Sequence, residues 1–223
     1  MPARRGNTMD AARALGRLMA RYGVEEESEA ALRLQRYLAL LEKWNAHVNL
    51  TASTAWSALG WLFEEALWAA RRYPQTGVAH LDIGSGAGFP AVPLRILRPA
   101  MRLRLVESRA RRGAFLETVA AQLGLEGTEV VCCRVEQYLR SEPVPEFDIV
   151  SWKAVKLGTT AMDLLLAASK PDTQIWLFHG AELPIEHSAR AHSRLRLLRR
   201  EHFPGRPERQ LSVFAVSRET CFT

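Results

Sequence analysis

A glycine-rich stretch between two apolar segments carries the clearest chemical signal in the sequence, and it reads LDIGSGAGFP over residues 81–90. Residues 78–83 are apolar enough for a buried strand, and residues 91–97 have the apolar spacing of a helix. Glycines between a strand and a helix allow a sharp turn and let a flat or charged ligand approach the peptide groups. The glycines concerned are Gly84, Gly86 and Gly88. Their spacing is not the dinucleotide pattern G-x-G-x-x-G, so a plain surface loop is the alternative.

Two acidic residues favour a ligand site over a plain loop. Asp82 lies inside the apolar strand just before the turn, where an uncompensated charge is costly, so it needs a fixed donor in the loop or in a ligand. About twenty residues later the apolar run 103–106 ends in Glu107. In a nucleoside-binding α/β unit an acid at this place accepts hydrogen bonds from ribose hydroxyls. Together the two acids predict a nucleoside ligand.

The elements that must position these residues follow an alternating pattern from residue 78 onward. Apolar runs predict strands, and amphipathic segments between them predict helices near 90–98, 109–123, 134–140 and 159–168. The strands are expected at 79–83, 103–107, 129–133, 147–152 and 173–178. This alternation predicts an α/β fold with a mostly parallel, doubly wound sheet that binds ligands at the carboxyl ends of its strands. Two late runs, 195–198 and 211–216, predict an antiparallel hairpin at the sheet edge.

The first 75 residues have a different pattern. Helical spacing is present over 10–22, from Ser28 to about Trp44, and over 55–73, with breaks at Gly23 and at 45–51. We therefore predict a helical N-terminal extension at 1–75 and a ligand-binding domain at 76–223. The aromatic residues of the extension are expected to pack in its core.

Composition is that of an ordinary soluble protein, with 48% hydrophobic and 24% charged residues. No apolar run approaches the roughly 20 residues of a membrane helix, and the first residues lack the apolar centre of a signal peptide, so we expect a cytoplasmic protein with no membrane partner. Cys132, Cys133 and Cys221 have neither disulfide nor metal-ligand spacing, and we expect no metal.

The chain is basic, with a formal net charge of +6 and an isoelectric point near 9.6. This charge permits a polyanionic partner. Arginines cluster in two places, which are either solvated faces or phosphate contacts around a shared cleft. The first cluster is Arg109, Arg111 and Arg112, and the second is Arg190, Arg194, Arg196, Arg199 and Arg200.

Polar residues also follow the later strands. Val135 and Glu136 follow the third strand, where they could read an adenine edge or simply begin a helix. Trp152 and Lys153 follow the fourth strand, and His179 ends the fifth, where a surface or capping role is the alternative to a ligand contact. We find no Ser/His/Asp order and no paired catalytic carboxylates, which suits transfer chemistry in which a cofactor supplies the reactivity.

The sequence LDIGSGAGFPAVPL at 81–94, with Trp44-Asn45 and Asn49-Leu50-Thr51 upstream, closely resembles the RsmG family, also called glucose-inhibited division protein B. The resemblance spans roughly residues 30–216. It implies a class I methyltransferase (Rossmann-like) fold that uses S-adenosylmethionine to methylate guanine N7 of ribosomal RNA in the small ribosomal subunit. Direct attack of N7 on the sulfonium methyl group would need no general base, so we predict no catalytic residue.

The resemblance also implies which residues bind. Cofactor contacts are expected at the strand and loop residues Asp82, Gly84, Gly86, Gly88 and Phe89, at Glu107, which would hold the ribose, and at Val135, Glu136 and Lys153. Substrate contacts are expected at Trp152, Lys153, His179, Arg109 and Arg112.

The chain departs from the family where Trp152-Lys153-Ala154 replaces the usual Ser-Arg-Ala, where His179 replaces a lysine and where Ala91 replaces a glycine. Lysine keeps the charge of arginine but loses its flat bidentate fork. These departures leave two alternatives open: a methyltransferase acting on another RNA position or a small molecule, and an inactive cofactor-binding or RNA-binding module.

Overall fold

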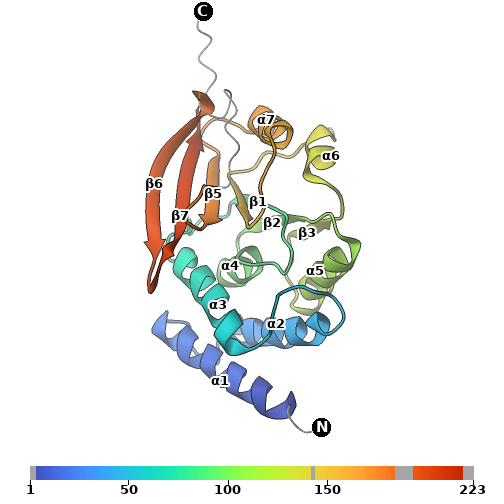
Figure 1. The fold of residues 1–223 in the computed structure, drawn as a ribbon, viewed down its shortest axis with the longest axis vertical. Helices are drawn as coiled ribbons and strands as arrows, with labels where there is room; N and C mark the ends of the chain where they lie inside the picture. The colour runs from blue at the N-terminus through green and yellow to red at the C-terminus, as the bar shows by residue number, and fades with distance from the viewer. Residues whose placement is uncertain (1–3, 142–143, 184–192, 218–223) are drawn as a thin grey trace, which may run out of the picture.

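A computed structural model describes residues 4–141, 144–183 and 193–217 of the chain. Three helices come first, and strands and helices alternate after them (Figure 1). The helices are α1 (Arg4–Arg21), α2 (Glu29–Asn45), α3 (Trp56–Ala70), α4 (Ala91–Leu97), α5 (Ala110–Gln122), α6 (Val135–Arg140) and α7 (Thr159–Ala168). The strands are β1 (Ala79–Ile83), β2 (Arg102–Val106), β3 (Thr128–Val131), β4 (Ile149–Lys153), β5 (Gln174–His179), β6 (Leu195–Phe203) and β7 (Arg206–Val216).

The strands form one seven-stranded sheet in the order β3-β2-β1-β4-β5-β7-β6. The first five strands are parallel to one another, and β7 pairs antiparallel with both β5 and β6. The strand order reverses between β1 and β4, which is where an open α/β sheet leaves a crevice at the carboxyl ends of its strands. The predicted fold, including the edge hairpin, is confirmed.

The helices cover both faces of the sheet. One hydrophobic cluster joins buried residues of α1, α2 and α3 to α4, α5 and one sheet face, and a second cluster fills the other face under α6 and α7. Figure 1 shows α1 to α3 gathered together at the bottom of the view and α6 and α7 at the top. The N-terminal helices therefore share a core with the sheet, and the predicted boundary at residue 76 stays a prediction.

The main difference from the predicted elements lies at the sheet edge, where both hairpin strands extend well beyond the apolar runs that predicted them. In β6 only the last residue, Phe203, is buried, and polar or charged residues occupy most positions after Leu198. An edge strand has few buried positions, so apolar patterning underestimates its length. No helix of the described residues is both long and apolar enough to cross a membrane.

Candidate functional site

The glycine turn after β1 depends on left-handed backbone conformations. The φ angles of Gly84, Gly86 and Gly88 are +68°, +57° and +90°. A Cβ added at Gly84 would lie 2.5 Å from Val155, and one at Gly88 would lie 2.6 Å from Val92. At Gly86 the nearest atom would be 3.6 Å away, an ordinary van der Waals distance, so packing within the protein excludes a Cβ at the two outer glycines but not at the middle one.

Glu107 ties this turn to the end of β2. Its carboxylate is 4% exposed and accepts hydrogen bonds from the backbone nitrogens of Gly86 and Arg109, both at 2.8 Å. A carboxylate offers about four lone-pair positions, so two acceptor positions remain for hydroxyl groups of a ligand. The predicted ribose contact at Glu107 therefore has the chemistry that it requires.

Asp82 ends a chain of buried hydrogen bonds. The hydroxyl of Ser151 on β4 donates to Asp82 Oδ1 at 2.6 Å, and His80 Nε2 lies 2.8 Å from the same hydroxyl oxygen. The hydroxyl of Tyr73, which follows α3, lies 2.9 Å from His80 Nδ1. Since Ser151 donates to Asp82, its oxygen must accept from Nε2, and Nδ1 then accepts from Tyr73. Every donor in the chain thus points toward the carboxylate.

Burial sets the charges in this chain. It lowers the pKa of His80 to about 3, so the imidazole is neutral and keeps a single proton on Nε2. Burial also raises the pKa of Asp82 to about 7, against the hydrogen bonds of Ser151 and Ser85, and the nearby charge of Glu107 raises it further. Asp82 is therefore a carboxylate held near its titration point beside the glycine turn.

The N-terminal helices reach the turn directly. The hydroxyl of Tyr37 on α2, a fully buried residue, donates to the carbonyl oxygen of Ala87. The ring of Phe89 packs against Tyr37 and Phe63, with centroid distances of 5.3 and 5.0 Å. Phe89 is 7% exposed, so its ring anchors the loop in the core and the contact expected there falls to its backbone.

The upstream motif lies next to the glycine turn. Asn45 Oδ1 accepts hydrogen bonds from the backbone nitrogens of Leu50 and Thr51 at 2.9 and 2.8 Å. These bonds hold residues 45–51, at the end of α2, in a compact loop. Arg112 donates to the carbonyl oxygen of Asn49 at 2.7 Å, and its Nη1 would be the nearest atom, at 3.6 Å, to a Cβ added at Gly86. The structure therefore brings the two family motifs together through Arg112.

Lys153 lies at the carboxyl end of β4, in a buried ion pair with Glu65 of α3. The side chains are 9% and 3% exposed, and the ammonium lies 4.4 Å from the ring centroid of Trp61. Burial lowers the pKa of Lys153, while the Glu65 carboxylate opposes this shift. The amine is placed at the predicted edge of the sheet, but its partner in the protein is a carboxylate that the sequence interpretation did not identify.

Two predicted substrate contacts are corrected. Trp152 is fully buried in the core under α6 and α7, because side chains alternate along a strand and Ser151 and Lys153 occupy the opposite face. It is therefore unavailable to an RNA. His179 is 5% exposed, and its ring nitrogens lie 2.7 Å from Gly180 O and 2.9 Å from Ser212 Oγ. Its surroundings give this histidine a structural role.

The remaining predicted residues are more accessible. Val135 and Glu136 are half-buried in the first turn of α6, and Arg109 is exposed just before α5. In the second arginine cluster Arg194 is buried and donates to Leu166 O at 2.5 Å, so it is a packing residue. Arg190 and Cys221 lie outside the described residues. Within the described part of the chain no group of His, Cys, Asp or Glu could hold a metal ion.

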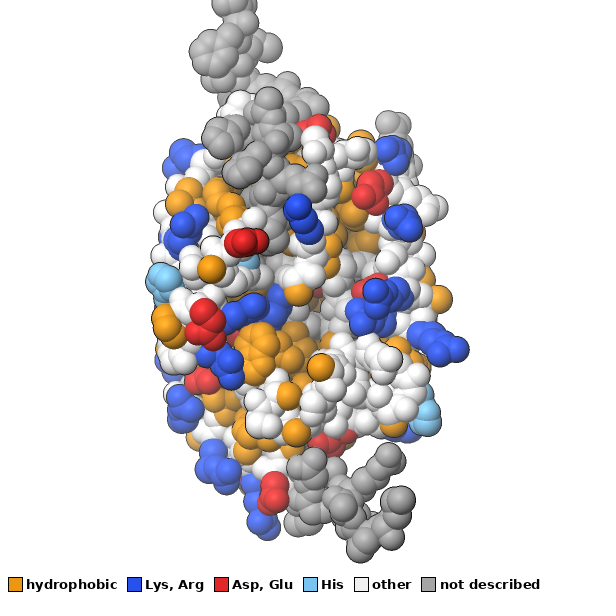
Figure 2. Space-filling model, in the orientation of Figure 1, with side chains coloured by type: hydrophobic (Ala, Val, Ile, Leu, Met, Phe, Trp, Pro, Cys, Tyr) orange, Lys and Arg blue, Asp and Glu red, His pale blue; other side chains and the backbone are white. Residues whose placement is uncertain are grey.

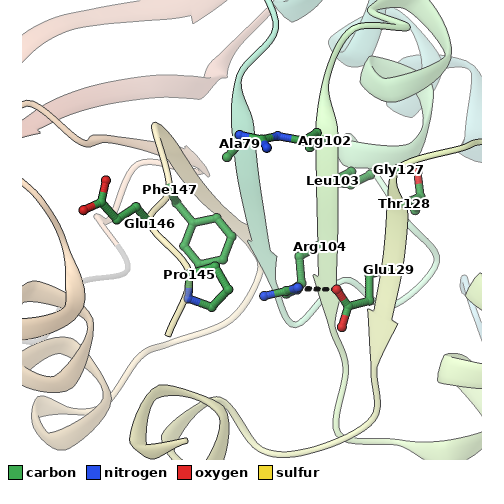
Figure 3. A pocket seen from close by; sticks show the side chains of 10 residues that line it. All are labelled: Ala79, Arg102, Leu103, Arg104, Gly127, Thr128, Glu129, Pro145, Glu146 and Phe147. Carbon is green, nitrogen blue, oxygen red and sulfur yellow. Dashed lines mark hydrogen bonds and ion pairs between the residues drawn. The ribbon is translucent and has the colours of Figure 1, made fainter. Parts of the chain in front are cut away.

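A pocket of about 500 Å³ lies at the opposite edge of the sheet, where the strands begin. Figure 3 shows Arg104 and Glu129 paired across β2 and β3, with Phe147 facing them from the segment before β4. Because ligands of such sheets bind at the carboxyl ends of strands, we assign the candidate site to the glycine turn and not to this pocket. Figure 2 shows Lys and Arg side chains on both sides of the centre of the face that is viewed in Figure 1.

Comparison with known proteins identifies the family to which this chain belongs. The family model described as rRNA small subunit methyltransferase G (GidB) matches residues 31–206. The chain belongs to this family. A curated relative from Myxococcus xanthus, named Ribosomal RNA small subunit methyltransferase G, is 35% identical over 86% of this chain and 91% of its own length. A relative of the same name from Limosilactobacillus reuteri is 33% identical over 75% and 72%.

Solved structures support the fold of this methyltransferase family member. A mutant of MtNAS in complex with S-adenosylmethionine aligns with a TM-score of 0.58 over 84% of this chain and 76% of its own, at 15% identity. The putative methyltransferase yhhF from Escherichia coli aligns with a TM-score of 0.52 over 69% and 83%, at 17% identity. The predicted family resemblance and enzyme class are confirmed.

The sequence interpretation missed four residues that shape this methyltransferase site: Tyr37, Tyr73, His80 and Glu65. One signal was available for His80, because it is a polar residue inside an otherwise apolar strand, as Asp82 is. A buried polar group requires a hydrogen-bond partner, and Ser151 is likewise a polar residue inside the apolar strand β4. No comparable signal exists for Tyr37, Tyr73 or Glu65, whose partners lie at least seven residues away in sequence.

Proposed function

We propose that this protein transfers the methyl group of S-adenosylmethionine to guanine N7 of ribosomal RNA in the small ribosomal subunit. The observation that carries the proposal is the glycine turn bounded by Asp82 and Glu107 at the carboxyl edge of the sheet, in a chain of the rRNA small subunit methyltransferase G family. Such a substrate makes the cytoplasm the expected place of action.

The residues present fit the cofactor. A Cβ at Gly86 would meet no atom closer than 3.6 Å, so the middle of the turn is less tightly packed than its two ends, and Glu107 keeps acceptor positions for two ribose hydroxyls. Asp82 supplies a carboxylate held by Ser151, and the half-buried first turn of α6 at Val135 and Glu136 can border the adenine. When bound, the cofactor would supply a sulfonium methyl group to the in-plane lone pair of guanine N7, and the carbon–sulfur bond would break to leave the neutral thioether S-adenosylhomocysteine.

The protein contributes alignment to this reaction, since N7 carries no proton to remove. Holding two reacting groups in line replaces a bimolecular encounter with an effectively unimolecular step. Tyr37 and Glu107 fix the turn from two sides, through Ala87 and Gly86. The buried chain from Tyr73 to Asp82 keeps the carboxylate in one orientation. The target base must be presented unstacked or in an accessible RNA fold.

The test is to incubate the protein with labelled S-adenosylmethionine and small-subunit RNA that lacks the modification, as naked RNA and as ribosomal particles. We expect labelled N7-methylguanine in the RNA, and its loss in the Glu107→Gln variant. Label at another RNA position or in a small molecule would replace the proposed substrate. Cofactor binding by calorimetry without turnover on either RNA would identify an inactive binding module.

A further inference from the structure

Three cations surround one half-buried tryptophan beside the candidate site. Trp61 of α3 has Lys153 Nζ at 4.4 Å from its ring centroid, Arg209 Cζ at 5.0 Å and Arg206 Cζ at 5.3 Å. All three distances are within the range of cation–π attraction. Trp61, Arg206 and Arg209, which we call the Trp61 cluster, therefore bring the start of β7 against α3 and the end of β4.

Positive charge exceeds negative charge at this cluster. Glu65 is the buried carboxylate here, and it already pairs with Lys153. Arg209 Nη2 lies 3.8 Å from the other oxygen of Glu65, beyond hydrogen-bond distance, and Arg209 Nε is buried with no hydrogen-bond partner among the described residues. Arg206 lies 3.9 Å from Glu208, whose side chain is 60% exposed. Both guanidinium groups thus retain donors that no described residue of the chain accepts from.

A purely structural role does not account for this arrangement. The pair of Lys153 and Glu65 is already neutral, and two further guanidinium groups beside it add like-charge repulsion. Burial is the largest cause of the lowered pKa of Lys153, and the charge of Arg209 lowers it further. An unpaired buried donor near other positive charges is costly unless an anion binds there.

We infer that the Trp61 cluster binds a backbone phosphate of the RNA substrate, next to the nucleotide that is methylated. The guanidinium fork matches the oxygens of phosphate, and packing on the indole holds each fork in a fixed plane. The cluster adjoins Lys153, which directly follows the strand residue paired with Ile83 at the start of the glycine turn. A phosphate held here positions RNA over the carboxyl edge of the sheet, on the side away from Arg112.

This inference rests on the proposed function for the identity of the anion, and RNA binding can be measured without methylation. The assay is equilibrium binding of small-subunit RNA to the full chain at several salt concentrations, without cofactor. The variants are Arg206→Gln, Arg206→Lys and the double variant Arg206→Gln/Arg209→Gln. The matched control is Arg17→Gln, which removes an exposed arginine from α1.

We expect the double variant to bind RNA about tenfold more weakly, with the slope of log affinity against log salt reduced by about 1, as for one lost phosphate contact. The single variant Arg206→Gln should show part of this loss of affinity. The Arg206 side chain is 43% exposed, so we expect this variant to fold. Arg206→Lys should recover the salt slope but only part of the affinity, because lysine lacks the fork. The affinity of Arg206→Gln for S-adenosylmethionine should be unchanged.

Unchanged RNA affinity and salt slope in folded Arg206→Gln and double variants would overturn the inference, as would an equal loss in Arg17→Gln. The two proposals fail separately. If the wild type methylates RNA while these variants bind RNA normally, only the phosphate site is wrong. If the wild type binds RNA through Arg206 but methylates nothing, the site stands and the proposed activity is wrong.

Discussion

Replacing Asp82 with asparagine should make the protein more stable and its cofactor binding weaker. Asp82 is 2% exposed, and its carboxylate accepts a hydrogen bond from the hydroxyl of Ser151, while the hydroxyl of Ser85 donates to the main-chain carbonyl oxygen of Asp82. Asparagine keeps a carbonyl oxygen that can accept from Ser151 but carries no charge. The stability that the wild type forgoes at high pH should therefore be recovered in Asp82→Asn.

The magnitude follows from the pKa of Asp82, which burial raises from 3.8 to about 7. A raised pKa in the folded state means that the contribution to stability is complete below pH 3.8 and is lost as the pH rises through about 7. The full difference corresponds to ~4 kcal/mol. Between pH 5 and pH 8 the wild type should lose ~2–3 kcal/mol of unfolding free energy through this group.

The measurement is urea unfolding of wild type and Asp82→Asn at pH 5, 6, 7 and 8. The difference between the two proteins cancels most other titrating groups, including His80, which is neutral throughout this range because its pKa is lowered to about 3. Asp10→Asn, at an exposed position of α1, is the control for loss of a carboxylate as such. Calorimetry at pH 8 gives the affinity for S-adenosylmethionine of each protein.

The stability advantage of Asp82→Asn over the wild type should grow by ~2–3 kcal/mol from pH 5 to pH 8, beyond any change seen in the Asp10→Asn control. A difference that does not change with pH would refute the assignment of a buried carboxylate with a raised pKa. Undiminished cofactor affinity in Asp82→Asn would remove this residue from the proposed binding site, whatever the stability result.

Three further predictions concern the contacts around the turn. Gly86→Ala should weaken cofactor binding and lower the free energy of unfolding by only ~1 kcal/mol, through its positive φ. Gly88→Ala should unfold more readily, because its Cβ would lie 2.6 Å from a neighbouring side chain. Denaturant unfolding and calorimetry of both variants test this contrast. Glu65→Gln should lower the free energy of unfolding by ~3–5 kcal/mol, because it leaves the buried charge of Lys153 unpaired. In a double-mutant cycle, Glu65→Leu/Lys153→Met should lose less unfolding free energy than the sum of its two single variants. Additive losses would contradict the buried pair. Tyr37→Phe should lose ~1–3 kcal/mol of stability and raise the cofactor dissociation constant, and an unchanged constant would show that its hydroxyl does not shape the turn.

The local elements near the site could be predicted because their signals are local. A strand that ends in three glycines and a helix that follows them are specified within about twenty residues, and β1 and α4 match the prediction closely. The acid at Glu107 could be found for the same reason, since only α4, a short turn and β2 separate it from the glycines. Trp152 was misassigned because its face of β4 depends on which helices cover each side of the sheet, which periodicity within one strand does not report.

The fold class, the glycine turn with Asp82 and Glu107, and the family can all be inferred from the amino-acid sequence, because backbone freedom at glycine and alternation of apolar residues act over short distances. The surroundings of that turn depend on how the helices pack on the sheet. The register in which α2 and α3 pack on the sheet sets the contacts of Tyr37 with Ala87 and of Glu65 with Lys153. These partners come from segments far apart in the chain, and the free energy that selects their pairing belongs to the assembled core rather than to any one segment.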